Sequence, residues 1–274
     1  MELIFSYWPF ALAMIATGVV SGVMAGLLGV GGGSIIVPAL ATALALMSFG
    51  NDVVQHIAVA TSLAVIIPTG ISSARSHHRR GAVDFKVLKL WAPVIFVATL
   101  AGGLMARWYS GDVLRIVFGV LAIFIAANIV LPFQERLIGH LRSSNLAHRV
   151  AAAVVGYLSA LMGIGGGSFT VPTLHAFGAP MHTAVGTSSA IGVAIAVAGT
   201  IGYMISGWGV PGLPPLSIGY VNLIALVFIG VAAYFCAPIG AALAHRLPQR
   251  GLKLVFAAFM LFVGLGMIWK AVAG

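Results

Sequence analysis

The sequence predicts an all-α integral membrane protein built from two repeats of inverted topology. Three observations predict this fold. The 274 residues are 61% hydrophobic and 7% charged, with a mean hydropathy of +1.10, whereas a soluble domain carries roughly 25% charged residues. A glycine-rich motif occurs twice, and basic residues fall in different loops of the two halves. We expect about five hydrophobic segments in each half, with short broken or re-entrant helices at the glycine motifs.

Ten apolar segments underlie this prediction. In order they lie at approximately 8–28, 34–49, 55–74, 86–108, 112–132, 149–162, 168–179, 183–206, 218–244 and 251–272. A spanning helix needs about 20 apolar residues, so 34–49 and 168–179 are short. Both follow a glycine motif, and we interpret each as the second arm of a helix pair that folds back at the glycines; two ordinary short helices are the alternative. Irregular backbone at membrane depth occurs only where it is buried or lines a cavity.

The duplication defines the domain organisation. The motif reads GVGGGSIIVP at residues 29–38 and GIGGGSFTVP at residues 163–172. Three further matches pair HIAVATS at 56–62 with HTAVGTS at 182–188, GAVD at 81–84 with GYVN at 219–222, and LRIVF at 114–118 with LKLVF at 252–256. We therefore treat 1–274 as one transmembrane domain, with a first repeat over approximately 8–132, a cytoplasmic linker over 133–148 and a second repeat over 149–274.

The distribution of charge predicts the orientation of the halves. One loop of the first half is strongly basic, with Arg75, Arg79, Arg80, Lys86 and Lys89, whereas its counterpart at 207–215 has no charge. Lys and Arg mark the cytoplasmic side, so equivalent loops lie on opposite sides and the halves are inverted. The same rule places both termini in the periplasm, with three crossings plus a re-entrant pair, or five crossings, in each half. The loop at 107–115, with Arg107 and Arg115, fits poorly because it should be outside.

The two glycine turns are the candidate substrate site. They comprise Gly31, Gly32, Gly33 and Ser34 in the first half, and Gly165, Gly166, Gly167 and Ser168 in the second. Glycine lets backbone amides approach a ligand closely, and Ser34 or Ser168 is well placed to be the N-cap of the following helix. A helix N-terminus favours an anion, and inverted halves would bring both N-termini together near the midplane. The alternative is that the glycines only permit tight helix crossing.

Polar side chains at matched positions complete the candidate site. Five hydroxyls could bind an oxyanion, those of Thr61, Ser62, Thr187, Ser188 and Ser189, or each could bond to its own helix. His56 and His182 could gate protons or contact an anion when charged, or they could mark interfacial helix starts. Pro38 and Pro172 are predicted structural breaks within the short segments.

Several absences limit the function. The acids are Glu2, Asp52, Asp84, Asp112 and Glu135, and none lies deep in an apolar segment. Carriers of cations usually keep an intramembrane acid, so the pattern favours an anionic substrate. We expect no metal site, because Cys236 is the only cysteine, and no catalytic residues or cofactor, because no enzyme motif is present. The net charge of +9 follows the topology pattern, so we expect a lipid bilayer and no nucleic acid as partner.

The duplicated GGGS…P turns, the Thr-Ser pairs and the GxVD/GxVN motifs resemble the TauE/SafE sulfite and sulfonate exporter family, also called the 4-toluene sulfonate uptake permease family. The resemblance covers approximately residues 10–272. It implies a secondary carrier in a bacterial inner membrane that exports sulfur-containing anions such as sulfite, sulfoacetate or other organosulfonates. A non-transporting assembly or receptor subunit is the alternative. The exact substrate, the direction, a coupling ion (proton or sodium) and the oligomeric state stay open.

Overall fold

The computed structural model describes residues 2–28, 32–47, 49–131, 144–244 and 249–273. Its helices are α1 (Glu2–Leu28), α2 (Gly33–Leu46), α3 (Asn51–Arg79), α4 (Phe85–Met105), the short 3-10 helix η1 (Ala106–Trp108), α5 (Gly111–Val130), α7 (Asn145–Met162), α8 (Gly167–Ala176), α9 (Met181–Ser206), α10 (Leu223–Ala244) and α11 (Gln249–Ala273). Two strands of two residues each, β1 (Ser217–Ile218) and β2 (Val221–Asn222), form an antiparallel hairpin. The predicted linker at 133–148 lies largely outside the described residues.

Six of these helices are long and apolar enough to cross a membrane, namely α3, α4, α5, α9, α10 and α11. The prediction of an all-α membrane protein is thereby confirmed. The two helices that follow the glycine motifs are short, as expected: α2 has 14 residues and α8 has 10. At about 1.5 Å per residue, neither reaches the roughly 30 Å of a bilayer core.

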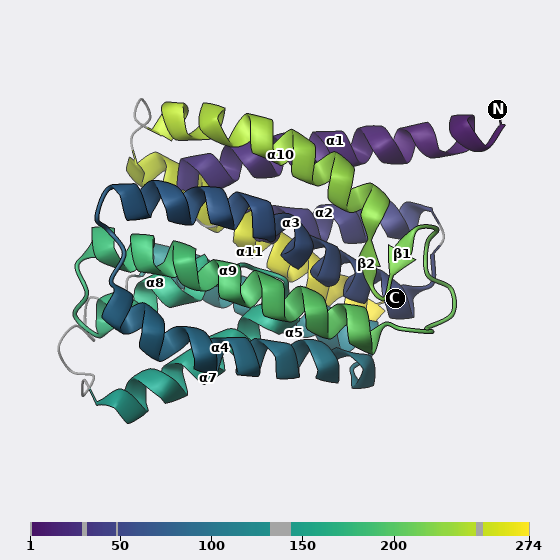
Figure 1. Cartoon of the computed structure of the whole chain (residues 1–274). Coiled ribbons are helices and arrows are strands. Elements are labelled where there is room, and N and C mark those ends of the chain that lie inside the picture. Colours follow the sequence, from purple (N-terminus) through teal and green to yellow (C-terminus); the bar gives the residue numbers. More distant parts are fainter. Residues whose placement is uncertain (1, 29–31, 48, 132–143, 245–248, 274) are drawn as a thin grey trace.

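The first helix, α1, begins at the same end of the bundle at which the last helix, α11, ends. Figure 1 shows α1 starting and α11 finishing on the right, while α3 runs towards the left end, where its last turn carries Arg79. The uncharged loop before α10 and the hairpin lie on the right. This arrangement puts the basic end of α3 opposite the two termini, as the charge pattern predicts.

The helix contacts are paired between the two halves. Helix α1 packs on α10 and α7 packs on α4; α2 packs on α3 and α8 on α9; α10 contacts α3 and α4 contacts α9. The contacts of α3 with α9 and of α5 with α11 join equivalent helices. Inverted repeats related by a two-fold axis would produce this pattern, and the division into repeats remains an interpretation.

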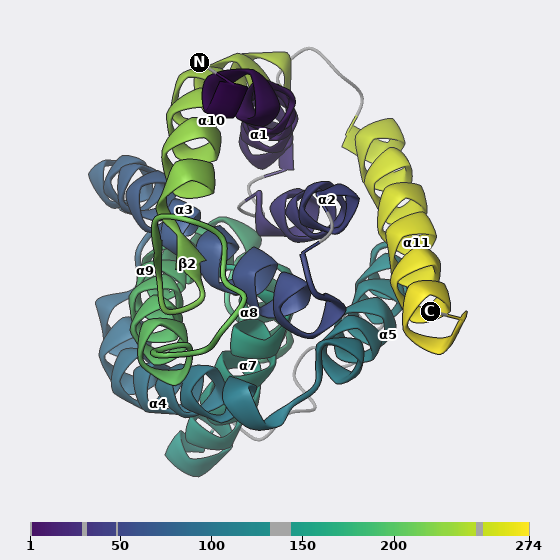
Figure 2. The ribbon, with the colours of Figure 1, turned by 90° about the vertical axis from the view of Figure 1, so that its right-hand side faces the viewer.

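Close helix crossings depend on small residues. On the α5–α11 contact, a Cβ built on Gly119 would lie 2.6 Å from the carbonyl oxygen of Gly264, and one built on Gly264 would lie 2.8 Å from that of Gly119. Small residues let helix backbones approach within a membrane. Viewed from the end that carries the termini, α2 lies inside a ring of longer helices (Figure 2).

The segment predicted at 218–244 begins differently from expectation. The hairpin occupies its first residues, and α10 starts only at Leu223. Gly219 has a φ of +55°, and a Cβ there would overlap the carbonyl oxygen of Met204 in α9. A glycine is therefore required where the hairpin turns against α9, and apolar composition alone did not reveal this turn.

Candidate functional site

The two glycine breaks meet inside the protein. A Cβ built on Gly33, at the start of α2, would lie 2.6 Å from the carbonyl oxygen of Gly163, the residue that ends α7. Ser62 of α3 donates a hydrogen bond of 2.7 Å to the same oxygen. The prediction that the breaks approach each other agrees with this contact. Gly31 lies outside the described residues.

The second break requires glycine for its backbone conformation. Gly163 has a φ of +70° and donates its N–H to the carbonyl of Ser159. Gly166 has a φ of +76°, and a Cβ there would overlap Cδ1 of Ile195 on α9. Both glycines lie in the left-handed region, which other residues adopt only with strain. Gly165 is constrained by packing, since its Cβ would lie 2.7 Å from Cγ2 of Ile66.

The predicted N-caps are wrong. The N-cap residues are Gly32 and Gly166, and neither helix has a side-chain cap. At α8 the reason is the left-handed Gly166, whose carbonyl already accepts from Phe169 N and Thr170 N. Ser34 and Ser168 consequently fall at the second helical position. No backbone hydrogen bond from Gly167 N or Ser168 N occurs among the described residues, as expected for the first turn of a helix.

Unpartnered hydroxyls lie around the second break. The side-chain oxygens of Ser159, Ser168, Thr170 and Ser188 are buried and lack a hydrogen-bond partner in the described part of the chain. Thr170 is 0% exposed and Ser188 2%. Buried polar groups are nearly always hydrogen-bonded, so these hydroxyls indicate a place for a polar ligand.

Contacts between α8 and α9 relate these groups in space. A Cβ on Gly166 would lie 3.1 Å from Oγ1 of Thr170, so this hydroxyl lies over the start of α8. On α9, a Cβ on Gly192 would lie 2.5 Å from the carbonyl oxygen of Gly165. Ser188 precedes Gly192 by four residues and therefore shares its helix face. The start of α8 therefore lies beside the Thr170 hydroxyl and packs against the face of α9 that carries Ser188.

Ser159 and Thr170 were not among the predicted site residues. Thr170 lies within the motif itself, and Ser159 lies four residues before Gly163, on the same face of α7. Their spacing from the glycines was the signal that could have identified them. Burial without a partner becomes visible only once α7, α8 and α9 are assembled.

The matched threonines make contacts between the halves. Asn222 N donates to Oγ1 of Thr61 at 3.0 Å, and Asp84 N donates to Oγ1 of Thr187 at 2.9 Å. Each threonine therefore connects α3 or α9 to the N-terminal end of a helix of the other half. Ser189 bonds to the carbonyl of its own helix at Val185, at 3.0 Å. Their predicted role in substrate binding stays a prediction.

The matched histidines differ in their surroundings. His56 is buried, with Nε2 2.9 Å from the carbonyl oxygen of Ala106 and its ring stacked on Tyr220 at 4.8 Å between centroids. Tyr220 lies in the loop before β2, and burial raises the pKa of its hydroxyl. His182 is exposed in the first turn of α9. A gating role for either histidine stays a prediction.

Pro38 and Pro172 do not interrupt their helices as predicted: α2 continues from Gly33 to Leu46 through Pro38, and α8 from Gly167 to Ala176 through Pro172. The breaks lie at the glycines before each helix. Among the described residues, no group of three or more His, Cys, Asp or Glu side chains could hold a metal ion.

A pocket of about 510 Å³ lies between α3 and Tyr234 of α10, and it is lined by Arg75, Arg79 and Arg80. This basic pocket lies at the end of α3 that the charge pattern assigns to the cytoplasm.

Known proteins resemble this chain over nearly its whole length. Residues 14–267 match the family described as Sulfite exporter TauE/SafE. A "Probable membrane transporter protein" of Haemophilus influenzae is 32% identical over 263 residues, which cover 96% of this chain and 100% of that protein. YunE of Bacillus subtilis is 26% identical over 94% of this chain and 97% of that protein. MJ0441 of Methanocaldococcus jannaschii is 24% identical over 93% of this chain and 94% of that protein. Both are also described as probable membrane transporter proteins. No solved structure matches the chain.

Proposed function

This chain belongs to the sulfite exporter TauE/SafE family of membrane transporters, and from that premise we propose that it carries small sulfur-containing anions by alternating access. Sulfite, sulfoacetate and other organosulfonates are the proposed substrates, with export as the direction. The proposed location is a bacterial inner membrane with both termini in the periplasm.

One observation carries the proposal: the half-buried N-terminus of α8 lies beside unpartnered buried hydroxyls. The N–H groups of Gly167 and Ser168 make no backbone hydrogen bond among the described residues, and the side chains of Thr170 and Ser188 are without partners. All of these groups can donate hydrogen bonds to an oxyanion, and the helix dipole favours negative charge at the same place. The backbone N–H groups can only donate, so together with the helix dipole they favour an anion over a cation.

The two glycine breaks lie where the two halves contact each other, which is where the halves would move against one another during transport. Ser62 of the first half holds the carbonyl of Gly163 in the second, and the threonine contacts join the halves on either side. In carriers with inverted repeats, discontinuous helices form the substrate site while the halves rearrange around it. Here α2 and α8 are the discontinuous helices.

The test measures saturable counterflow of sulfite and of sulfoacetate in proteoliposomes. We expect Thr170→Val and Ser188→Ala each to weaken apparent substrate affinity at least about tenfold, since a hydrogen bond to a charged group is lost. Because these hydroxyls have no partner among the residues that the structure describes, neither change should lower thermal stability. A loss of function with unchanged stability separates substrate binding from a structural role.

Matched controls come from the same helices. Thr173 bonds to the carbonyl of Phe169 in α8, and Ser206 bonds to that of Tyr203 in α9; Thr173→Val and Ser206→Ala should transport like the parent. Full affinity in both test variants would overturn the site. Absence of counterflow for every sulfur anion, together with a protein partner that co-purifies, would favour an assembly or receptor subunit instead.

A further inference from the structure

Two basic residues lie at the end of the bundle where the charge rule expects none. Arg115 is in the first turns of α5, and Lys270 is in the last turn of α11. The last turn of α11 lies at the end of the bundle that carries the two termini, opposite the end of α3 (Figure 1), and Arg115 lines the same pocket as Lys270. Topology therefore does not explain these two charges, and the poor fit of the 107–115 loop needs a different reason.

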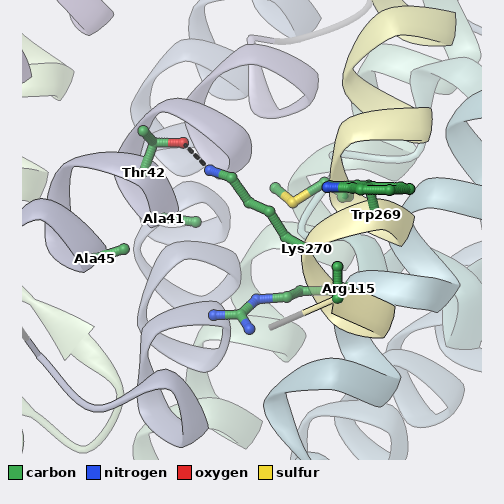
Figure 3. A pocket seen from close by; sticks show the side chains of 8 residues that line it. Ala41, Thr42, Ala45, Arg115, Trp269 and Lys270 are labelled. Carbon is green, nitrogen blue, oxygen red and sulfur yellow. Dashed lines mark hydrogen bonds between the residues drawn. The ribbon is translucent and has the colours of Figure 1, made fainter.

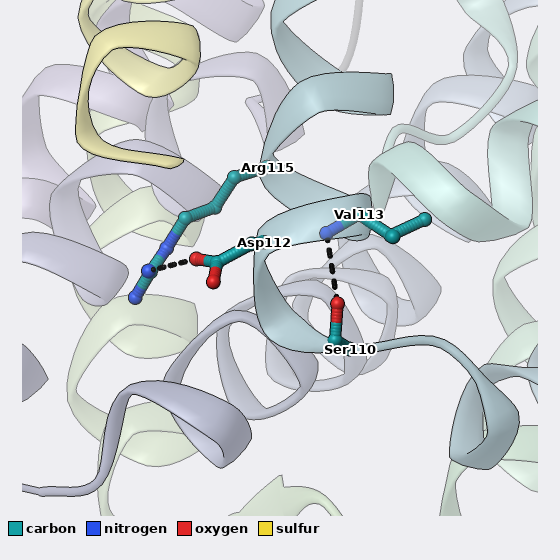
Figure 4. A network of polar contacts seen from close by, with 4 residues as sticks. All are labelled: Ser110, Asp112, Val113 and Arg115. Carbon is teal, nitrogen blue, oxygen red and sulfur yellow. Dashed lines mark hydrogen bonds and ion pairs between the residues drawn. The ribbon is translucent and has the colours of Figure 1, made fainter. Parts of the chain in front are cut away.

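The side chain of Arg115 is directed inward rather than into the loop. It is 6% exposed, and its Nη1 donates to Oδ1 of Asp112 at 2.8 Å (Figure 4). Ser110 begins the helix by accepting a hydrogen bond from Val113 N at 3.3 Å. The cap and the ion pair fix the first turn of α5, so the guanidinium is held in one place.

Arg115 and Lys270 line one pocket of about 310 Å³ between α2, α5 and α11. Figure 3 shows both side chains extending towards α2, where Lys270 Nζ donates to Oγ1 of Thr42 at 3.4 Å. In the described part of the chain, Lys270 has no carboxylate within ion-pair distance. The volume is at the lower end of the range for small-molecule sites.

The rest of the pocket is apolar. Its walls are formed by Ala41 and Ala45 of α2 and by Met267, Trp269 and Ala273 of α11. Two cationic groups in a pocket whose other walls are mostly apolar suit a ligand of mixed character. A tetrahedral oxyanion head would reach Lys270, Arg115 and Thr42, and a short apolar body would contact the alanines.

We propose that this pocket is an anion-binding site, separate from the α8 turn, for small organic anions with a tetrahedral oxyanion head and a short apolar body. The inference deepens the proposed function, because it adds a site for the same class of anion at the outer end of the carrier. Binding there would tie α2 to α11, and α2 is the helix whose first residue contacts the other break at Gly163.

The experiment measures binding of ethanesulfonate to the full-length protein in nanodiscs by isothermal titration calorimetry. Lys270→Gln should weaken binding about tenfold, since one hydrogen bond to a charged group is removed, and Lys270→Arg should restore most of it. Lys89→Gln is the control, because Lys89 is an exposed lysine on α4 outside the pocket. Unchanged affinity in Lys270→Gln would overturn the proposal, as would equal loss in Lys89→Gln.

Two arms identify the source of the anion. Nanodiscs of phosphatidylcholine alone are compared with nanodiscs that also contain phosphatidylglycerol, whose phosphate headgroup has the net negative charge that the zwitterionic phosphatidylcholine headgroup lacks. Competition that depends on Lys270 assigns the site to a lipid headgroup, whereas its absence assigns the site to a free anion.

The variant Thr170→Val separates this inference from the proposed function. If ethanesulfonate binds that variant with parental affinity, the outer site stands even where transport fails. If sulfite transport is normal but Lys270→Gln binds ethanesulfonate like the parent, the outer site alone is refuted.

Discussion

Replacing Gly166 by alanine adds one methyl group at the turn that begins α8. The residue has a φ of +76°, and the new Cβ would overlap Cδ1 of Ile195. The left-handed conformation costs roughly 1–2 kcal/mol for an L-residue, and overpacking costs about 1–3 kcal/mol. We therefore expect Gly166→Ala to destabilise the protein by about 2–5 kcal/mol.

Two further glycines separate the two contributions. Gly178 has a φ of +92° with nothing within 4 Å of its Cβ position, so Gly178→Ala should show the backbone cost alone. Gly266 is in α11, also with open space, and has no positive φ; Gly266→Ala should be neutral or slightly stabilising, because alanine is the better helix former.

The assay is apparent thermal unfolding in detergent at one fixed scan rate. The expected order of stability is Gly266→Ala, then Gly178→Ala, then Gly166→Ala. Adding Ile195→Val removes the overlapping Cδ1 and should restore part of the loss in Gly166→Ala. Equal stability of Gly166→Ala and Gly178→Ala would refute the packing argument. Equal stability of Gly166→Ala and Gly266→Ala would refute the whole argument.

Two other predictions follow from hydrogen bonds that join elements. Thr61→Val leaves the buried N–H of Asn222 without its acceptor and should cost about 1–3 kcal/mol, whereas Thr200→Val, whose hydroxyl bonds only within α9, should cost less in the same unfolding assay. His148, at the end of the predicted linker, accepts from Nε1 of Trp91 at 3.1 Å, and burial lowers its pKa below 6.5. As the pH drops below about 6.5, the unfolded chain takes up the proton before the folded chain does, so the stability of the folded protein falls. His148→Gln should therefore lose less thermal stability than the parent between pH 7.5 and pH 5.5. An equal loss of stability in both proteins would contradict this prediction.

The positions of the helices could be predicted from the sequence because a helix that faces lipid consists of a continuous run of apolar residues. Each apolar segment corresponds to a helix, and the short segments after the glycines are the short helices α2 and α8. Proximity of the breaks at Gly33 and Gly163 was also predictable, since duplication and charge together imply two inverted halves.

Other features depend on backbone angles or on distant contacts. The N-cap at Gly166 follows from a left-handed φ, which the run of three glycines permits at several positions without selecting one. The outer pocket joins Arg115 and Lys270, residues from opposite halves of the chain, so no local pattern could bring them together. Ser159 and Thr170 could not be identified from the sequence, because only the assembled structure shows which buried hydroxyls are left without a hydrogen-bond partner.

The matched hydroxyls of α3 and α9 bear on where the proposed anion would bind. Thr61 and Thr187 accept equivalent hydrogen bonds from Asn222 and Asp84, so this pair serves contacts between the halves in the same way on both sides. The serines one position later are not equivalent: the hydroxyl of Ser62 is engaged by Gly163, whereas that of Ser188 has no partner among the described residues. An anion placed symmetrically between the two turns would have to displace the Ser62 bond. At the α8 turn it would satisfy groups that are unpaired in the described part of the chain, so our proposal places the anion beside Ser188 rather than midway between the breaks.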